Sequence, residues 1–417
     1  MINQTFLNRF FSILLSVSAS LFYHQTYAQM KGCTDRLASN YNSGATINDG
    51  TCTYSPATVN VVSSVSLPAQ MKGTSGLIWM NNKLWTQNNF SDINLYSFLP
   101  DQVSNFQTTS LTGTTNIDWE EMTQDENYMY IGDFGNNVNG NRTNLQILRI
   151  RKHSLLQGIS NVDTIRFSYN TQTNFSPTGA NKTNYDCEAF FATKDSLYLF
   201  TKEWLTNKTS IYRLPKTSGN YSAVLVTSFD VQGLITGAVL LESKRLLVLS
   251  GYNNTLQPFL YLLYDYPGYR FFDGNKRKLN LNLPFHQVEA ITTQDGINYH
   301  ITNEALTQSF VNVPQQLHEL NISPYISSYL STTPTYDFLY SNKIKIYPVP
   351  ANSNINVELP DDRTVLPYKI INSQGALVQQ GIWNKWQGNI DVSSLHGGTY
   401  WIVLTAGKTY IRQWVKQ

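Results

Sequence analysis

The sequence predicts an all-β protein in which a five- or six-bladed β-propeller is followed by a small C-terminal antiparallel β-sandwich. Three observations predict it. Only 14% of the 417 residues are charged while 13% are aromatic, a composition that favours strands over charged helical surfaces. A strand–turn–strand pattern recurs through the middle of the chain, and short alternating apolar runs fill its end. The formal net charge of +2 argues against a nucleic-acid partner.

Residues 1–28 are predicted to be a secretory signal peptide. Arg9 precedes an apolar run over residues 10–22, and cleavage is expected after Ala28. The run is about 13 residues long, shorter than the roughly 20 that span a bilayer. A membrane anchor is the alternative. We therefore expect an exported mature chain without a transmembrane segment.

Residues 29–56 are predicted to form a small module closed by a disulfide between Cys33 and Cys52. Export places the chain in an oxidising compartment, where cysteines close in sequence pair by default. The intervening segment is rich in Asn, Asp, Ser and Gly and is too polar to build a core. A disulfide closing a loop of this size would add about 3 kcal/mol of stability.

This module resembles the short GCTDPxAxNYNPxATxDDGSC modules of exported Bacteroidetes proteins. The matching residues are Gly32, Cys33, Thr34, Asp35, Ala38, Asn40, Tyr41, Asn42, Ala45, Thr46, Asp49, Gly50 and Cys52. Asp35, Asn48 and Asp49 carry the oxygen ligands that calcium prefers, so they are candidates for a calcium site. The alternative is a spacer in which these residues only make turns.

Residues 57–326 contain a recurring unit that predicts the propeller. In each copy an apolar strand leads through a polar turn into an aromatic-rich strand. Aligned on Gly76, Glu120, Glu188, Gly237 and Glu289, the copies lie between about 44 and 68 residues apart, which brackets the roughly 40–50 residues of a four-stranded blade. A two-sheet sandwich or a β-helix is the alternative. The chain has no G-x-G-x-x-G, P-loop or G-x-S-x-G motif, which excludes the common nucleotide-binding and α/β-hydrolase sites.

Acidic residues occupy the same slot in three of these copies. Alternate residues of a strand share a face, so the acids point away from the predicted core residues Trp119, Cys187 and Val288. If the acid-bearing strands are the innermost ones, their glutamates converge on the propeller axis. Converging carboxylates repel unless a cation compensates, and calcium suits such a site. The predicted metal ligands are Glu120, Glu188, Glu289, Asp118, Asp186 and Asp133.

A structural alternative to the metal site is that a neighbouring Lys, Arg or amide neutralises each glutamate separately. Lys202 occupies the corresponding place in one copy and is suited to pairing with a carboxylate or binding a substrate anion. Cys187 is expected to be a buried free thiol, because its potential partners are already paired. No residue is predicted to be catalytic.

The D-W-E-E-M and Y-I-G-D-F-G-N-N strings resemble exported bacterial propellers described as phytase-like or esterase-like. That resemblance implies channel acids that hold calcium and orient a phosphoester or ester. Only Glu120, Glu188, Glu289 and Asp133 can be carried over from it.

The end of the chain changes character. Residues 327–342 are predicted to be a linker, and residues 343–417 a separate sandwich of short alternating strands. This part resembles the C-terminal sorting domain of the type IX secretion system of Bacteroidetes, through motifs similar to YPNPA, D-x-x-G-K, IDLSxL and GxY. The matching motif residues are Tyr347, Pro348, Pro350, Gly375, Asp391, Gly398 and Tyr400. The resemblance implies handling by the type IX machinery and secretion or attachment to the outer-membrane surface. A generic Ig-like binding domain is the alternative.

Two functions remain open at this point. The first is a calcium-stabilised surface module that binds glycan or protein through Tyr- and Trp-rich loops. The alternative is a calcium-dependent propeller hydrolase acting on phosphoesters, esters or lactones. The lack of a recognisable nucleophile–base pair favours binding, since amide and aromatic side chains suit sugars.

Overall fold

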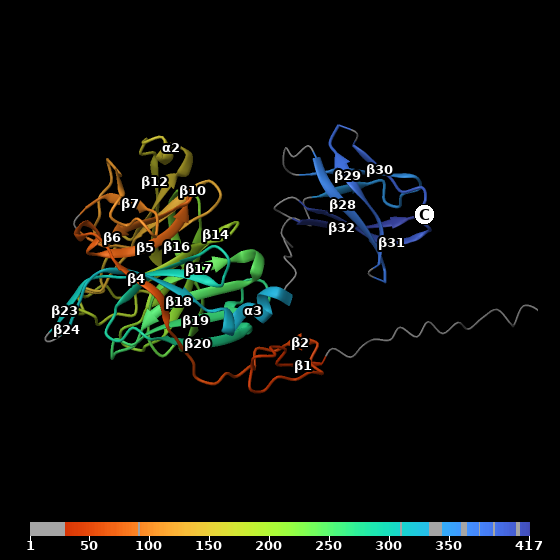
Figure 1. Ribbon diagram of the computed structural model, residues 1–417. Helices are drawn as coiled ribbons and strands as arrows, with labels where there is room; N and C mark the ends of the chain where they lie inside the picture. Colours follow the sequence, from red (N-terminus) through yellow and green to blue (C-terminus); the bar gives the residue numbers. More distant parts are fainter. Residues whose placement is uncertain are drawn as a thin grey trace, which may run out of the picture.

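The computed structural model describes residues 30–90, 92–308, 311–332, 344–359, 365–374, 376–386, 388–405 and 409–417. The predicted signal peptide and the motif residue Gly375 lie outside these ranges. The described chain is mostly β, as the composition predicts (Figure 1).

Five blades of four strands each form a propeller. Blades 1 and 2 consist of β5 (Thr74–Met80), β6 (Lys83–Asn88), β7 (Asn94–Phe98) and β8 (Gln107–Ser110), and of β9 (Trp119–Gln124), β10 (Tyr128–Asp133), β11 (Gln146–Arg151) and β12 (Val162–Tyr169). Blades 3 and 4 consist of β13 (Asp186–Ala192), β14 (Ser196–Lys202), β15 (Thr209–Pro215) and β16 (Gly219–Phe229), and of β17 (Leu234–Leu241), β18 (Leu246–Tyr252), β19 (Pro258–Tyr264) and β20 (Asn275–Leu281). Blade 5 consists of β21 (Val288–Thr293), β22 (Asn298–Asn303), β25 (Gln316–Asn321) and β4 (Val61–Ser66).

The ring of blades is closed by joining the two ends of the propeller segment. β4, which precedes blade 1 in sequence, pairs antiparallel with β25 as the outer strand of blade 5. In Figure 1 the orange β4 accordingly lies among the cyan strands of that blade. The inner strands β5, β9, β13, β17 and β21 contact one another in a closed cycle. The propeller therefore has five blades, and the sixth left open by the sequence is absent from the described residues.

Further pairings tie blades to their neighbours and to the connecting segments. β12 pairs parallel with β16, so blades 2 and 3 share one eight-stranded sheet. β3 (Thr58–Val59) adds a parallel edge to β20. The remaining elements around the blades are η1 (Ala69–Met71), α2 (Lys152–Leu156), η2 (Glu242–Lys244), η3 (Phe271–Asp273) and the hairpin of β23 (Leu306–Gln308) and β24 (Val311–Val313).

Every inner strand carries a β-bulge at the same place. We take as the bulged position the first residue after the last regular pair that precedes the register shift. From blade 1 to blade 5 these positions are Ser75, Glu120, Glu188, Thr236 and Glu289. The next positions are Gly76, Glu121, Ala189, Gly237 and Ala290. The sequence alignment, which set Gly76 and Gly237 opposite the three glutamates, is therefore wrong by one residue in blades 1 and 4. A bulge adds one residue to a strand and re-aims the side chains that follow it.

The core lies between blades, where apolar side chains of adjacent sheets interdigitate. Trp119, Cys187 and Val288 are fully buried, as predicted from their position between acidic neighbours. Cys187 is a free buried thiol, and burial raises the pKa of this thiol well above its usual value. It is therefore a packing residue and not a reactive one.

A chain of side-chain hydrogen bonds fastens the closing strand to blade 5. Ser64 Oγ on β4 lies 2.7 Å from His318 Nδ1 on β25, and His318 Nε2 lies 2.8 Å from Asn303 Oδ1 on β22. A neutral imidazole satisfies both contacts by accepting from the Ser64 hydroxyl and donating to the Asn303 carbonyl oxygen. Burial and the neighbouring His286 lower the pKa of His318 to about 4.

This chain of hydrogen bonds predicts a loss of stability in acid. The pKa of His318 is lower in the folded protein than in the unfolded one, so its stabilising contribution is present above about pH 6.5 and is lost as the pH falls towards 4. Between these two pH values the free energy of unfolding should fall by on the order of 2 kcal/mol more in wild type than in His318→Gln. Denaturant titrations at both pH values measure the difference. His153→Gln, an exposed control on α2, should behave like wild type, and an equal pH slope in all three proteins contradicts the assignment.

The N-terminal module is docked on blade 4. Its disulfide joins Cys33 to Cys52 as predicted, and β1 (Lys31–Gly32) pairs parallel with β2 (Ile47–Asn48). The Asp35 carboxylate accepts hydrogen bonds from the hydroxyls of Tyr54 and Tyr264. Asn48 Nδ2 donates to Asp265 at 3.0 Å and to Asn275 at 2.9 Å.

The proposed calcium ligands of this module therefore have separate partners. Asp35 and Asn48 fasten the module to blade 4, whereas the Asp49 carboxylate accepts from the backbone and hydroxyl of Thr51. These contacts support the spacer alternative, in which the Asx residues make turns and docking bonds.

The predicted linker starts too early. Helix α3 covers Ser323–Thr332, so residues 327–332 are helical. Ile326 is fully buried, and Tyr329 and Leu330 pack against the core shared by blades 4 and 5. The alternation of Ser and Tyr over this segment suggested a spacer, but the apolar residues lie on one helical face that the propeller covers.

The C-terminal part forms two small sheets around a common core. One contains β26 (Lys345–Tyr347), β27 (Asn354–Glu358) and β30 (Asn389–Asp391), and the other contains β28 (Val365–Asn372), β29 (Leu377–Asn384), β31 (Gly398–Thr405) and β32 (Thr409–Lys416). Buried side chains of both sheets, including Ile355, Ile402 and Trp414, meet in one cluster. The predicted antiparallel β-sandwich is confirmed.

Candidate functional site

The bulges place a ring of polar side chains in the propeller channel. Glu120, Glu188 and Glu289 come from blades 2, 3 and 5 and are each at least 95% buried. Blades 1 and 4 contribute hydroxyls, since Ser75 Oγ lies 3.5 Å from Glu120 Oε2 and Thr236 Oγ1 donates to the Val288 carbonyl at 2.5 Å. The three glutamates thus occupy equivalent bulge positions of their inner strands.

Lys202, the last residue of β14, supplies positive charge beside Glu188. Its ammonium nitrogen lies 3.2 Å from Glu188 Oε1, and it faces the rings of Trp204 and Tyr252 at 4.8 and 5.1 Å from their centres. Burial alone would lower the pKa of Lys202, but the carboxylates of Glu188 and Glu289 outweigh burial and raise it. We call Lys202, Glu120, Glu188, Glu289, Asp118 and Asp186 the acid–lysine cluster.

One lysine does not balance this many carboxyls, and burial favours the protonated form of the glutamates. Burial, together with the nearby acids, raises the pKa of Glu120 and Glu188 well above its usual value. Burial raises the pKa of Glu289 to about 8, although Lys202 opposes the shift. Glu289 Oε2 is buried and has no hydrogen-bond partner among the described residues. Burial thus favours the neutral, protonated form of Glu289.

The two remaining acids of the cluster are aspartates at the starts of the inner strands β9 and β13. Asp186 accepts the backbone N–H of Asn136 at 2.6 Å and the indole N–H of Trp204 at 2.7 Å. Asp118 is half-buried, and burial and Asp186 raise its pKa to about 6. A β-carbon at Gly135 would lie 2.3 Å from Glu120 Oε1 and 2.4 Å from Asp118 Oδ2, so only glycine lets this backbone cover the acids.

Asp133, the sixth predicted ligand, does not belong to the cluster. Arg142 pairs with its Oδ1 at 2.9 Å, and Gln146 donates to its Oδ2 at 3.1 Å. Asp133 Oδ1 also accepts the backbone N–H of Asp118. Asp133 therefore holds the loop that follows β10, a structural role that the sequence pattern does not distinguish from ligation.

Glu121 was not predicted, although it fills the channel one position beyond the glutamate ring. The equivalent residues of the other blades are Gly or Ala, so one long side chain enters a space left by four small ones. Glu121 Oε1 accepts the N–H of Met122 at 2.8 Å, and Oε2 accepts that of Ala238 in blade 4 at 3.2 Å. Blades 2 and 4 are not neighbours, so this carboxyl crosses the channel. The doubled acid in W-E-E-M was the available signal.

The arrangement does not fit the predicted calcium site. Within the described ranges no group of three or more His, Cys, Asp or Glu side chains is placed to hold a metal ion. The positive charge beside Glu188 is the ammonium group of Lys202, 3.2 Å from Oε1. The structural alternative, neutralisation by a neighbouring lysine, describes Glu188 directly.

Loops that precede the inner strands, and loops between the second and third strands of the blades, lie at one end of the propeller. We call this end the loop face. It exposes large apolar side chains on six different loops, namely Phe90, Ile117, Val138, Phe175, Leu205 and Phe285.

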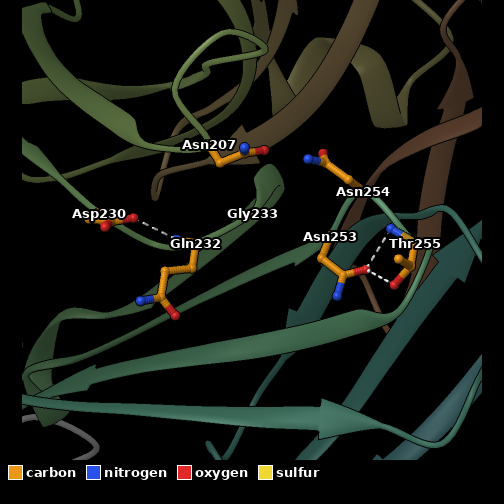
Figure 2. Close-up of a pocket in the computed structure, with 7 residues that line it drawn as sticks. All are labelled: Asn207, Asp230, Gln232, Gly233, Asn253, Asn254 and Thr255. Carbon is orange, nitrogen blue, oxygen red and sulfur yellow. Dashed lines mark hydrogen bonds between the residues drawn. The ribbon is translucent and has the colours of Figure 1, made fainter.

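A hollow of about 350 Å³ opens on the loop face between blades 3 and 4. Figure 2 shows its walls, which come from three loops. The lining residues are Asn207, Asp230, Gln232, Gly233, Asn253, Asn254 and Thr255. Four of these seven carry amides, and the sequence offered no motif that would have brought them together.

The described residues of the sorting motif lie where the chain turns into and between strands. Pro348 and Pro350 follow cis peptide bonds just after β26. Asp391 Oδ1 accepts the N–H of Ser393 at 2.8 Å, and the Tyr400 hydroxyl donates to the His396 carbonyl at 2.8 Å.

Comparison with known proteins identifies the end of the chain. Residues 345–417 match the family described as a secretion system C-terminal sorting domain. This match supports export as a type IX secretion substrate. None of the helices in the described part of the chain is both long and apolar enough to cross a membrane.

Matches outside the sorting domain concern the fold alone. No curated protein matches the chain. A calcium-binding regucalcin from Agrobacterium tumefaciens is 8% identical, with 64% of this chain and 97% of that chain covered and a TM-score of 0.36. A β-fructofuranosidase from Bombyx mori is 11% identical, with 87% of each chain covered and a TM-score of 0.37. Likenesses at this level carry no argument about ligand or activity.

Proposed function

We propose that this protein is an exported, surface-displayed binding module whose propeller engages its ligand with the loop face. The sorting domain supports the export. The hollow between blades 3 and 4 carries the binding half of the proposal, because it is open to solvent and its amide groups are suited to hydrogen bonding with a ligand.

The burial of the channel side chains argues against catalysis in the channel, and therefore favours a binding function at the loop face. Lys202, Glu120, Glu188 and Glu289 are each at least 95% buried, so no substrate touches them without opening the blades. The ammonium group of Lys202 pairs with Glu188, and burial favours the neutral form of the glutamates. We therefore assign the acid–lysine cluster to joining the blades and assign no calcium to it.

One observation favours hydrolysis as the second candidate function. The Glu289 carboxyl has a pKa of about 8 and an unpartnered oxygen, which are the properties of a general acid at neutral pH. A channel that opened on substrate binding would bring this proton to an ester, phosphoester or lactone.

The loop face is tested with a matched pair of substitutions. Leu205 on the loop face is 63% exposed and Val62 on the outer strand β4 is 61% exposed. The mature chain is tested against immobilised polysaccharides and extracellular proteins by biolayer interferometry. Leu205→Asp should weaken binding at least tenfold because a charge then needs desolvation in the contact, while Val62→Asp should bind like wild type. Equal affinities for both variants contradict the assignment.

The same protein separates the two candidate functions. We expect no turnover of phosphoesters, esters or lactones, with or without calcium. Turnover that disappears in Glu289→Gln while Leu205→Asp retains it would instead establish the hydrolase.

A further inference from the structure

We propose that the hollow between blades 3 and 4 is a subsite for a neutral saccharide. In this assignment Asn207, Gln232 and Asn254 bind sugar hydroxyls, and Phe285 packs on the apolar face of a sugar ring. The inference rests on the proposed function and goes beyond it by naming the ligand class and the residues that select it.

The amide groups lining the hollow have hydrogen-bonding capacity to spare. Asn207 and Asn254 face each other across the opening in Figure 2. Asn207 Oδ1 is buried without a hydrogen-bond partner among the described residues. A buried amide oxygen left unpaired costs free energy, so a ligand hydroxyl that donates to it has a clear advantage over an apolar group.

The walls of the hollow are held in place by the surrounding blades. The Gly233 N–H donates to the Asn207 carbonyl at 3.1 Å. This bond joins the wall before β17 to the wall between β14 and β15. Lys278 Nζ donates to the carbonyls of Val231 and Gln232 at 2.8 and 2.9 Å. A β-carbon on Gly233 would lie 2.5 Å from the Phe259 ring, so this wall is packed directly against the blade.

The remaining wall, the loop between β18 and β19, is fixed by its own turn. Asn253 Oδ1 accepts the backbone N–H groups of Thr255 and Gln257, each at 3.0 Å. The Phe285 N–H donates to the Leu256 carbonyl at 2.9 Å, which ties the loop of this aromatic residue to the same turn. Phe285 is 47% exposed and lies outside the residues that line the hollow itself. Fixed walls lower the entropic cost of binding.

These groups match the chemistry of a sugar. An amide donates two hydrogen bonds and accepts others, which suits hydroxyls because they also do both. The C–H face of a pyranose is apolar and packs on an aromatic ring such as that of Phe285. An apolar group seated in the hollow would leave the amide donors without partners.

Charge selects neutral over acidic sugars. Asp230 is the one charged residue among those that line the hollow in the described chain, and it is exposed. The ammonium of Lys278 points to the backbone carbonyls and lies 3.9 Å from the centre of the Phe259 ring, so it offers no partner to a carboxylated sugar. Asp230 therefore repels uronates and sulfated sugars.

Calorimetric titration of the mature protein tests the inference. The probes are neutral manno-, galacto- and gluco-oligosaccharides and acidic oligogalacturonate. At least one neutral oligosaccharide should bind, with oligogalacturonate at least tenfold weaker. Asn254→Ala, Asn207→Gly and Phe285→Gly should each weaken neutral binding at least tenfold. Glycine is chosen at positions 207 and 285 because their φ angles are 54° and 67°.

Two controls complete the experiment. Asn161→Ala, at an exposed turn before β12, should bind like wild type, and thermal melting should show all variants folded. Asp230→Asn should narrow the difference between neutral and acidic oligosaccharides.

The possible failures can be told apart. Neutral binding that is unchanged in both Asn254→Ala and Asn207→Gly overturns the subsite, as does a preference for oligogalacturonate. Binding of a protein from the panel that is weakened by Leu205→Asp, with no oligosaccharide bound, overturns the saccharide inference but leaves the proposed function standing. If the propeller protein binds neither an oligosaccharide nor a protein, both the saccharide inference and the proposed function are overturned.

Discussion

A Lys202→Met variant is expected to lose about 3–5 kcal/mol of unfolding free energy at pH 8, the cost typical of breaking a buried ion pair from one side. The substitution leaves Glu188 without the ammonium group that lies 3.2 Å away. It also removes the positive charge that opposes the raised pKa of Glu289. Urea denaturation followed by tryptophan fluorescence measures the loss.

The loss should depend on pH. Glu120, Glu188 and Glu289 have a higher pKa in the folded protein than in the unfolded one, so protonation stabilises the fold below their unfolded pKa, and this contribution is lost as pH rises through the folded pKa. For Glu289 that value is about 8. The destabilisation by Lys202→Met should therefore be larger at pH 9 than at pH 6.

The double variant Lys202→Met/Glu188→Gln is the decisive control. It removes the carboxylate along with its cation, so it should recover part of the lost stability. Lys208→Met, at an exposed position in the next loop, should change stability by less than about 0.5 kcal/mol. A Lys202→Met protein as stable as wild type would contradict the role given to the ammonium group.

Calcium provides an independent check of the same cluster. If Lys202 and protonation balance the charges, the melting temperature of wild type should not respond to calcium. A calcium-dependent rise that disappears in Glu120→Gln, Glu188→Gln and Glu289→Gln would show that Lys202 is insufficient and would restore the calcium site predicted from sequence.

Deletion of residues 343–417 is expected to abolish delivery to the cell surface and to leave the protein in the periplasm. The deleted part contains the matched sorting domain, residues 345–417, while the blades are closed by β4 and β25 without it. Cell fractionation combined with protease treatment of intact cells measures surface exposure.

A point substitution serves as the matched control for this deletion. Trp386 is 82% exposed and lies outside the sorting motif, so Trp386→Ser should reach the surface like wild type. Unchanged surface delivery of the truncated protein would contradict the role of the domain.

The sequence was sufficient to predict the blades because their pattern is local. Each blade repeats a strand–turn–strand unit. Burial of Trp119, Cys187 and Val288 is predictable because each is an apolar residue between polar neighbours in a strand. The number of blades was not predictable in the same way. It depends on β4 pairing with β25, two strands separated by almost the whole propeller segment.

For the candidate site, too, the periodic features were predictable from the sequence and the contacts between distant residues were not. The glutamates of blades 2, 3 and 5 were found because they recur at one position of a repeat. The bulge register, the crossing of Glu121 to blade 4, and the pairing of Asp133 with Arg142 were not found, because each depends on a contact that leaves no periodic trace in the sequence.

The sequence by itself predicted export, a fold built of strands and three equivalent acids in its repeat, and the sorting-domain match and the sheets support the first two. These properties reside in short motifs and in the periodicity of side chains along a strand. Only the folded structure revealed that Lys202 pairs with Glu188, and that scattered amides meet in one hollow. Electrostatic balance and surface shape depend on distances between residues of different blades, and those distances exist only once the ring has closed.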